Sequence, residues 1–277
     1  IFRVSGEIEI QQTLMSRDFK IQDMLQRGIR MRAVARRTFA SAMSLTPPRV
    51  AIVLSGSGVY DGSEITESTA TLIHVSRLQA KFQCFAPDKD QHHAVDHTQG
   101  IEHADTRNVL VESARIARGD VKPLSDLNPD DYDGLIIPGG FGAAKNLSSW
   151  AIDGIECKVD PDMEKCIDAF HASGKPIGAC CIAPTLLAKC IPGCTVTVGS
   201  GNIDDEANWP YAGTAKQIQE LGCTHVETDI TGVTVDGKNN LVTSAAYMYN
   251  GKPYEIHDSV GLMVEKVLTI AYGAKLK

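Results

Sequence analysis

The chain has 277 residues, of which 43% are hydrophobic and 22% charged, and its net charge is -7. This length and composition are typical of a globular protein with one large domain or two small ones. No stretch approaches the roughly 18 consecutive apolar residues of a membrane-spanning helix, so no membrane span is expected. Residues 1–48 carry a net charge of +4, which leaves -11 for the rest of the chain. This acidic body has no basic stripe, and nucleic acid is therefore not expected as a partner.

The basic N-terminal part is predicted to be a targeting segment. No Asp or Glu occurs from Met24 to Pro48, while arginines alternate there with apolar residues. An Arg-rich, Ser-containing and acid-free composition is typical of a mitochondrial transit peptide, although a solvated basic tail has a similar composition. We interpret residues 24–45 as a transit peptide that directs the protein to the mitochondrial matrix. Residues 1–23 are interpreted as an upstream extension or an expression artefact.

From Arg49 onward, apolar runs of strand length alternate with helical patterns, with no internal repeat and no linker. We expect strands at 49–54, 82–87, 134–137, 175–180 and 195–198, helices at 64–80, 161–173, 184–190, 211–221 and 260–272, and a hairpin joining 233–235 to 241–244. Alternating strands and helices predict one doubly wound α/β sandwich, here spanning residues 49–274. Ligands bind such sheets at the carboxyl ends of the strands, so the turns that follow strands are the candidate sites.

Eight cysteines are present, without a secretory signal to favour disulfides. Most are expected to be buried as small hydrophobic residues, and Cys190 and Cys194 are close enough in sequence to face one another. No C-x-x-C pair or matching histidine pair completes a zinc site, so no metal is expected.

The first candidate turn, Ser55–Glu64 (SGSGVYDGSE), follows a predicted strand and leads into a helix. Its glycines begin like a dinucleotide-binding G-x-G-x-x-G motif, but Asp61 occupies the position of the third glycine, and no cofactor is expected. Glu64 at the helix start has two interpretations. It is either a charge favourable to the helix dipole or a carboxyl group aimed into the crevice at the strand ends.

The second turn, Pro138–Gly142 (PGGFG), is either a tight connection or a backbone N–H site for an anion. The third, Gly178–Pro184 (GACCIAP), has the small residues of a nucleophile elbow between a buried strand and a helix. Cys181 would lie at the helix N-terminus, where the dipole stabilises a thiolate. Cys180 is expected on the opposite face of the strand. The alternative is that both are core thiols.

Together, SGSGVYDGSE, PGGFGAAKNL and CCIAP, in this order after strands, resemble the ElbB-like branch of the ThiJ/PfpI (class I glutamine amidotransferase-like) superfamily, and its vertebrate mitochondrial members in particular. The resemblance covers essentially all of 49–274. It implies a flavodoxin-like α/β sandwich with a mostly parallel sheet covered by helices on both faces. It also implies a nucleophilic Cys181, a carboxyl partner supplied by Glu64, and oxyanion-type donors from the backbone N–H groups of Gly140 and Ile182.

The chain departs from the superfamily pattern at the residues that supply a base. Ile182 stands where many PfpI-type members carry histidine, and the elbow lacks the G-x-C-x-G of true amidotransferases. The sequence His225-Val226-Glu227 resembles the amidotransferase His-x-Glu, but it precedes a hairpin and not a final helix. His257, before the last helix, is the other candidate base, although a surface position suits it equally. Without a base beside the cysteine, glutamine hydrolysis is disfavoured.

Two functions remain open on sequence grounds. The first is a cofactor-independent, glyoxalase- or deglycase-like reaction of Cys181 with a small α-oxoaldehyde, with Glu64 moving the proton. The second is a non-catalytic homodimer or higher homo-oligomer in mitochondria, with a redox-sensing thiol or a structural, partner-binding role.

Overall fold

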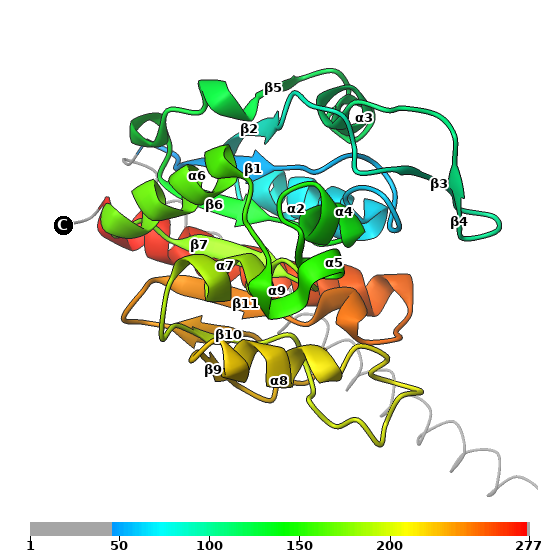
Figure 1. Cartoon of the computed structure of the whole chain (residues 1–277). Helices are drawn as coiled ribbons and strands as arrows, with labels where there is room; N and C mark the ends of the chain where they lie inside the picture. Colours follow the sequence, from blue (N-terminus) through cyan, green and yellow to red (C-terminus); the bar gives the residue numbers. More distant parts are fainter. Residues whose placement is uncertain (1–45, 276–277) are drawn as a thin grey trace, which may run out of the picture. The chain divides into compact units, whose positions relative to one another are not determined.

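The parallel sheet predicted from the sequence is present in the computed structural model, which describes residues 46–275 (Figure 1). The expected extension and transit peptide, residues 1–45, lie outside the described residues. Seven strands form the sheet in the order β10-β11-β7-β6-β1-β2-β5. All neighbours pair in parallel except β10 and β11. The strands are β1 (Arg49–Val53), β2 (Lys81–Ala86), β5 (Val121–Pro123), β6 (Gly134–Ile137), β7 (Ile177–Cys180), β10 (Thr234–Asp236) and β11 (Leu241–Ser244).

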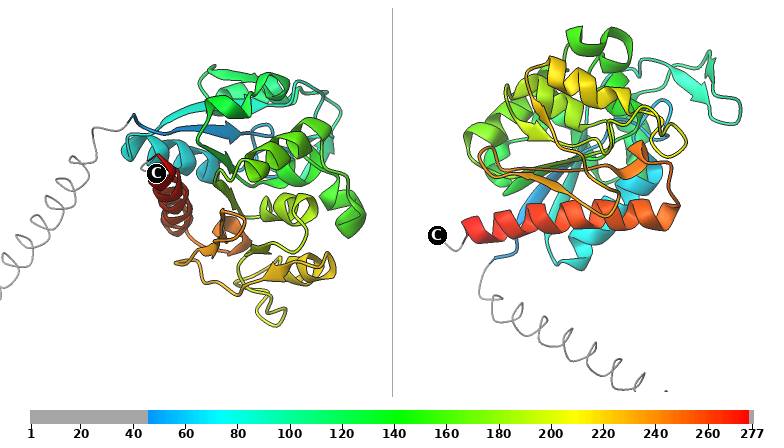
Figure 2. Two further views of the ribbon diagram at one scale, coloured as in Figure 1. Left: turned by 90° about the vertical axis from the view of Figure 1, so that its left-hand side faces the viewer. Right: turned by 90° about the horizontal axis from the view of Figure 1, so that it is seen from below.

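Helices cover both faces of this sheet, which confirms the flavodoxin-like α/β sandwich. Helices α2 and α9 pack on each other and cover one face, while α6 and α7 lie on the other (Figure 2). The helices are α2 (Ile65–Arg77), α3 (Val109–Ile116), α4 (Phe141–Lys145), α5 (Trp150–Asp153), α6 (Pro161–Ala172), α7 (Pro184–Cys190), α8 (Gly213–Glu220) and α9 (Pro253–Ala274). Within residues 46–275, no helix has both the length and the apolar character needed to cross a membrane.

The central strands are apolar throughout because both of their faces are covered. Every residue of β6 and β7 is buried, as expected for a parallel strand between two helical layers. Helix α9 approaches β7 closely at Gly178, where a Cβ atom would lie 2.5 Å from Met263 Sδ and 2.7 Å from Val267 Cγ2. This glycine therefore sets the distance between the sheet and its longest described helix.

Several parts of the chain differ from the sequence-based expectation. The strand expected at 195–198 is shorter, as β8 (Thr195–Val196), and it pairs with β9 (Thr224–His225) outside the main sheet. The neighbour of β7 on this side is β11, and the N–H of Thr197 donates to the Thr243 side chain instead of a backbone carbonyl.

The last helix begins at Pro253 and not at residue 260. Proline suits the first helical position, and the Glu255 side chain accepts a hydrogen bond from the N–H of Lys252, so the polar first turn is stable. Helix α3 and the hairpin of β3 (Ala94–Asp96) and β4 (Ile101–His103) were not predicted. Each hairpin strand has only three residues, and all three residues of β4 are exposed, so neither strand shows a clear apolar pattern.

Four adjacent strands, β11, β7, β6 and β1, end at the same edge of the sheet. From β1 the chain first builds β2 and β5 on one side and then β6, β7 and β11 on the other. The connections therefore diverge between β1 and β6, which is where doubly wound sheets bind ligands.

Replacing Gly178 with valine tests the close packing of β7 and α9. The added side chain would overlap Met263 and Val267, so we expect the free energy of unfolding to fall by about 2 kcal/mol or more. Gly273→Ala is the matched control, because no atom lies within 4 Å of a Cβ at this helical position. Urea unfolding of both variants measures the difference, and equal stability of Gly178→Val and the parent would contradict the packing.

Candidate active site

Cys181 occupies a strained turn directly after β7. Its φ angle is +60°, a conformation that non-glycine residues seldom adopt, and its N–H donates to the carbonyl of Ser244 at 3.1 Å. The thiol is only 7% exposed and lies in the wall of a cavity. Strain of this kind is common at functional sites, where the surrounding structure holds it in place.

The strained turn also changes the expected position of Cys180. Side chains alternate between faces only while the backbone is extended, and Cys181 has left that conformation. Cys180 Sγ lies 3.9 Å from Glu67 Oε2, and the Cys181 thiol is hydrogen-bonded to the same carboxyl group. Both thiols therefore meet at one carboxyl, and of the two only Cys181 lines the cavity.

This carboxyl belongs to Glu67, on the first turn of α2, and it is completely buried. The N–H of Gly139 donates to Oε2 at 2.9 Å, and the N–H of Tyr247 donates to Oε1 at 3.1 Å. Burial, reinforced by the nearby charge of Glu64, raises the pKa of Glu67 to about 8, although the two backbone donors oppose this shift. Glu67 can therefore carry or release a proton near neutral pH.

The sulfur of Cys181 is surrounded by groups that act on its charge in opposite directions. Burial, and then the charge of Glu67, raise the pKa of Cys181, whereas the backbone N–H groups of Gly140 and Ile182 bond to the sulfur and lower it. Because the thiol and the carboxyl are in direct contact, the charge of one group affects the titration of the other. These two donors are the ones expected from the sequence, and the structure directs them at the sulfur.

Glycine is required where the second turn passes this pair. A Cβ on Gly139 would lie 2.9 Å from Cys181 Sγ and 2.7 Å from Glu67 Oε2. Gly140 has a φ of +94°, and a Cβ there would strike the backbone of the first turn. The two turns are joined by backbone hydrogen bonds from Glu64 N to Gly139 O and from Phe141 N to Val59 O.

Glu64 has a different place from the one expected. It is the N-cap of α2, and its Oε2 accepts a hydrogen bond from the N–H of Glu67 at 2.7 Å. Burial is the main cause that raises its pKa, and the carboxyl group lines the same cavity as Cys181. The structure thus gives the position beside the thiol to Glu67 and leaves Glu64 at the cavity wall.

Sequence reasoning missed Glu67, although a signal was present. Glu67 follows Glu64 by three residues, so both lie on the same side of the first helical turn. Which of the two reaches the thiol depends on where the helix begins. Because the helix starts at Ile65, Glu64 is used as its cap and Glu67 points inward.

The candidate histidine bases lie elsewhere. His257 bonds to Asp258 at 2.9 Å, and its ring centroid is 4.4 Å from that of His74, at the contact between α2 and α9. His225 accepts a hydrogen bond from the N–H of Val198 at 3.3 Å. Among the described residues, neither histidine lines the cavity, and no group of three or more His, Cys, Asp or Glu could hold a metal.

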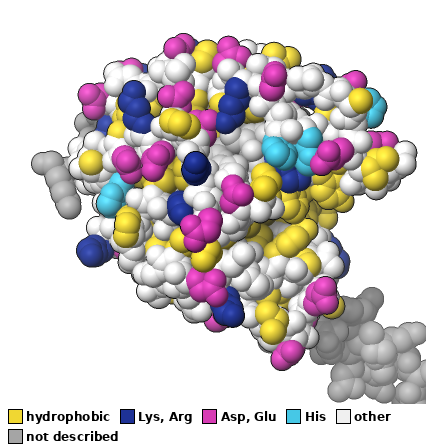
Figure 3. Space-filling view, viewed as in Figure 1, with side chains coloured by type: hydrophobic (Ala, Val, Ile, Leu, Met, Phe, Trp, Pro, Cys, Tyr) yellow, Lys and Arg dark blue, Asp and Glu magenta, His cyan; other side chains and the backbone are white. Residues whose placement is uncertain are grey.

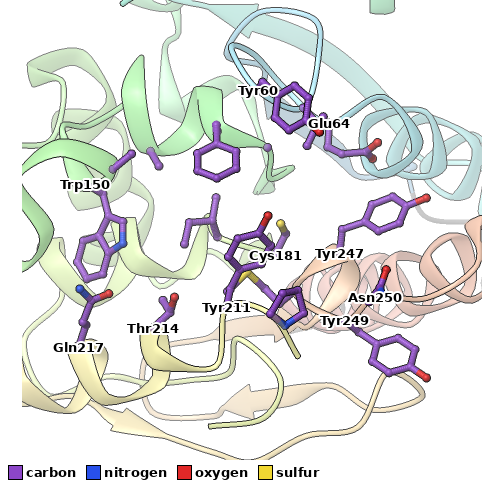
Figure 4. A pocket seen from close by; sticks show the side chains of 18 residues that line it. Tyr60, Glu64, Trp150, Cys181, Tyr211, Thr214, Gln217, Tyr247, Tyr249 and Asn250 are labelled. Carbon is purple, nitrogen blue, oxygen red and sulfur yellow. The ribbon is translucent and has the colours of Figure 1, made fainter. Parts of the chain in front are cut away.

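The cavity has a volume of about 510 Å³ and opens at the edge of the sheet where the four strands end (Figure 4). On the corresponding side of the space-filling view, hydrophobic side chains gather in a recess (Figure 3). The lining comes from the turns after β1, β6, β7 and β11 and from α5 and α8: Val59, Tyr60, Glu64, Gly140, Phe141, Ala144, Trp150, Ala151, Cys181, Ile182, Pro210, Tyr211, Thr214, Gln217, Tyr247, Met248, Tyr249 and Asn250.

The raised pKa of Glu67 predicts a pH dependence of stability. The folded protein holds the Glu67 proton up to about pH 8, whereas the unfolded chain releases it near pH 4.5. This contribution to stability is therefore complete below about pH 4.5 and is lost as pH rises to about 8. Relative to Glu67→Gln, the parent protein should lose about 2 kcal/mol or more between pH 5 and pH 8. Urea unfolding at several pH values measures this, with the exposed Glu164→Gln as control, and parallel curves for parent and Glu67→Gln would contradict it.

Comparisons with known proteins identify relatives of this chain. Residues 115–250 match the model of the DJ-1/PfpI family. The chain is 50% identical over 235 residues to the Homo sapiens protein "Glutamine amidotransferase-like class 1 domain-containing protein 3, mitochondrial", covering 83% of this chain and 87% of that protein. It is 51% identical over 223 residues to the Rattus norvegicus "ES1 protein homolog, mitochondrial", covering 80% and 84% of the two chains.

A crystal structure from Ehrlichia chaffeensis, described as an isoprenoid biosynthesis protein with an amidotransferase-like domain, has 32% sequence identity and a TM-score of 0.71. It matches over 80% of this chain and 99% of its own. The names of the human and rat relatives support a mitochondrial location. The resemblance seen in the three turns is thereby confirmed, and the chain belongs to the DJ-1/PfpI family.

Proposed function

We propose that the protein is a cofactor-independent enzyme that converts α-oxoaldehydes to 2-hydroxy acids, a glyoxalase- or deglycase-like reaction with Cys181 as nucleophile. The observation that carries this proposal is the hydrogen bond between the Cys181 thiol and the buried Glu67 carboxyl, with the thiol in the wall of an open cavity. Glu67 replaces Glu64 as the proton-transferring group, because Glu67 bonds to the thiol. A carboxyl with a pKa of about 8 suits both donation and removal of a proton.

The reaction begins when the Glu67 carboxylate takes the proton of the Cys181 thiol and the sulfur adds to the aldehyde carbon. A C–S bond forms, and the carbonyl oxygen takes that proton from the Glu67 carboxyl to give a thiohemiacetal. The Glu67 carboxylate then removes the proton from the former aldehyde carbon, which gives an enediolate, and returns it to the neighbouring carbon, while the hydroxyl proton passes to the oxygen of that neighbouring carbon. The product of this shift is a thioester of the 2-hydroxy acid. Water cleaves the C–S bond and regenerates the thiol, so that one oxoaldehyde and one water give one 2-hydroxy acid.

The backbone donors support the charged states of this sequence. The N–H groups of Gly140 and Ile182 face the sulfur and stabilise the thiolate before attack and after release. Glutamine hydrolysis has less support, because among residues 46–275 no histidine lines the cavity to activate the thiol and shuttle its proton.

A second candidate function is a redox-sensing thiol without turnover. Cys181 is the cysteine that lines the cavity in the described part of the chain, so a peroxide entering there would meet this thiol. For either function we propose a homo-oligomer in the mitochondrial matrix, with residues 24–45 as the transit peptide and 49–274 as the folded domain.

The first test is the conversion of methylglyoxal to lactate. Cys181→Ala should abolish it, and Glu67→Gln should lower kcat/KM by about 100-fold or more, the range of general acid–base catalysis. Glu64→Gln should have a smaller effect, because Glu64 does not bond to the thiol. Cys190→Ser, a half-buried cysteine outside the cavity, is the control and should retain full activity.

The pH profile separates catalysis from a structural role of Glu67. Glu67 loses its proton near pH 8, and its carboxylate can then take the proton of the Cys181 thiol, so kcat/KM of the parent should rise with pH through about 8 and Glu67→Gln should lose this inflection. Turnover by Cys181→Ala at the parent rate would refute the proposal. Absence of turnover, together with peroxide oxidation confined to Cys181, would favour the redox function instead.

A further inference from the structure

The cavity around Cys181 has an unusual balance of charge. Among residues 46–275, its lining contains one carboxylate, Glu64, and no lysine, arginine or histidine. Lys145 contacts two lining residues but is already engaged with them. Its Nζ donates to the carbonyl of Tyr60 at 3.1 Å and lies over the Phe141 ring. A carboxylate or phosphate entering the cavity would therefore lose water without gaining a cationic partner.

The lining is also rich in aromatic rings. Tyr60, Phe141, Trp150, Tyr211, Tyr247 and Tyr249 all contribute to the wall. With a volume of about 510 Å³, the cavity lies in the range that encloses ligands of drug size, and a three-carbon oxoaldehyde would fill little of it. The shape and the surface are those of a site for a larger apolar molecule.

Cys181 lies between two differently lined ends of this cavity. Trp150 and Gln217 lie on one side of the thiol, whereas Glu64, Tyr247 and Asn250 lie on the other (Figure 4). The Trp150 end is the apolar one, because Trp150 packs in a small buried cluster with Ala144, against which Ile182 also packs. A carbonyl held at Cys181 therefore has an apolar wall on one side and a carboxylate on the other.

We propose that the cavity selects carbonyl compounds with an aromatic or bulky apolar body at the Trp150 end, uncharged or cationic, and that Glu64 excludes compounds bearing an anionic group. The carbonyl as the reacting group rests on the proposed function. The selection by shape and charge does not, because any reagent that approaches the Cys181 thiol experiences the same walls.

Three thiol reagents with one reacting group and different bodies test this selection. The Cys181 thiolate attacks the sulfenyl sulfur of a methanethiosulfonate, forms a disulfide and releases methanesulfinate. Benzyl, trimethylammonioethyl and sulfonatoethyl methanethiosulfonates are compared at pH 8 on the full chain. The labelling rate at Cys181 is read by mass spectrometry, divided by the rate of each reagent with a free small thiol, and corrected with Cys181→Ala.

The sulfonatoethyl reagent should react at least about tenfold more slowly than the benzyl and trimethylammonioethyl reagents, since a single like charge at a partly buried site produces an effect of this order. Equal normalised rates for the three reagents would overturn the proposal. A faster reaction of the anion would do so as well.

Two variants assign the selection to named residues. Glu64→Gln keeps an oxygen to cap α2 but removes the charge, so the sulfonatoethyl rate should rise several-fold relative to the benzyl rate. The ratio is used because the charge of Glu64 also acts on Glu67 and through it on the thiol, which affects every reagent alike. Trp150→Ala should lower the benzyl rate several-fold without changing the ratio of the two charged reagents, and Trp150→Phe should restore it. Glu164→Gln on α6 is the control for loss of a surface carboxylate. An unchanged ratio of the sulfonatoethyl and benzyl rates in Glu64→Gln would refute the role of Glu64.

The outcome is independent of turnover. Selective labelling of Cys181 without conversion of any oxoaldehyde would refute the proposed function and leave the inference standing. Conversion of methylglyoxal together with unselective labelling would support the proposed function and refute the inference.

Discussion

The buried carboxyl group of Glu67 is the interaction on which the site depends. It accepts hydrogen bonds from the N–H of Gly139 after β6 and of Tyr247 after β11, and it contacts both thiols at the end of β7. One side chain on α2 thus joins the ends of three strands. A charged carboxyl without such partners would be very costly at this depth, and its raised pKa is the consequence of burial that the hydrogen bonds only partly offset.

The backbone around Glu67 is arranged to bring its partners within reach. Cys181 and Ala246 both have positive φ angles, +60° and +43°, although neither is glycine. The conformation of Cys181 exposes its thiol to the cavity and to the carboxyl. Ala246 directly precedes Tyr247, whose N–H bonds to the carboxyl. Gly139 leaves the space in which sulfur and carboxyl meet. The strain of these turns is balanced by the packing of the buried strands on which they stand.

The site therefore consists of two parts, the Cys181–Glu67 pair and the cavity that surrounds the thiol. In the proposed reaction, the thiol and the carboxyl transfer the protons and the two backbone donors stabilise the sulfur. In the proposed selection, the walls choose the carbonyl compound, because the described lining has aromatic rings and one carboxylate but no cation. Chemistry and selection thus come from different elements, the former from the strand ends and the latter largely from the loops and from α5 and α8.

The sequence by itself determined the α/β sandwich, the central strands β1, β6 and β7, and the three turns that build the site. Buried parallel strands are continuous apolar runs, and turns of Gly, Pro and Cys between strand and helix are local features that a sequence displays directly. The donors Gly140 and Ile182 could be named from the resemblance of these turns to the ThiJ/PfpI superfamily. The short strand β5 and the β3–β4 hairpin could not be placed, because segments of three residues show no periodicity.

Only the tertiary structure decided which glutamate meets the thiol. Glu64 and Glu67 are three residues apart, and the start of the helix at Ile65 makes Glu64 the cap and turns Glu67 inward. The contribution of Tyr247, 180 residues from Glu67, depends on β11 lying beside β7, which no local pattern reveals. The cavity wall likewise joins residues from Val59 to Asn250. Such contacts are set by the packing of the whole sheet and its helices, and the sequence specifies them only through the complete fold.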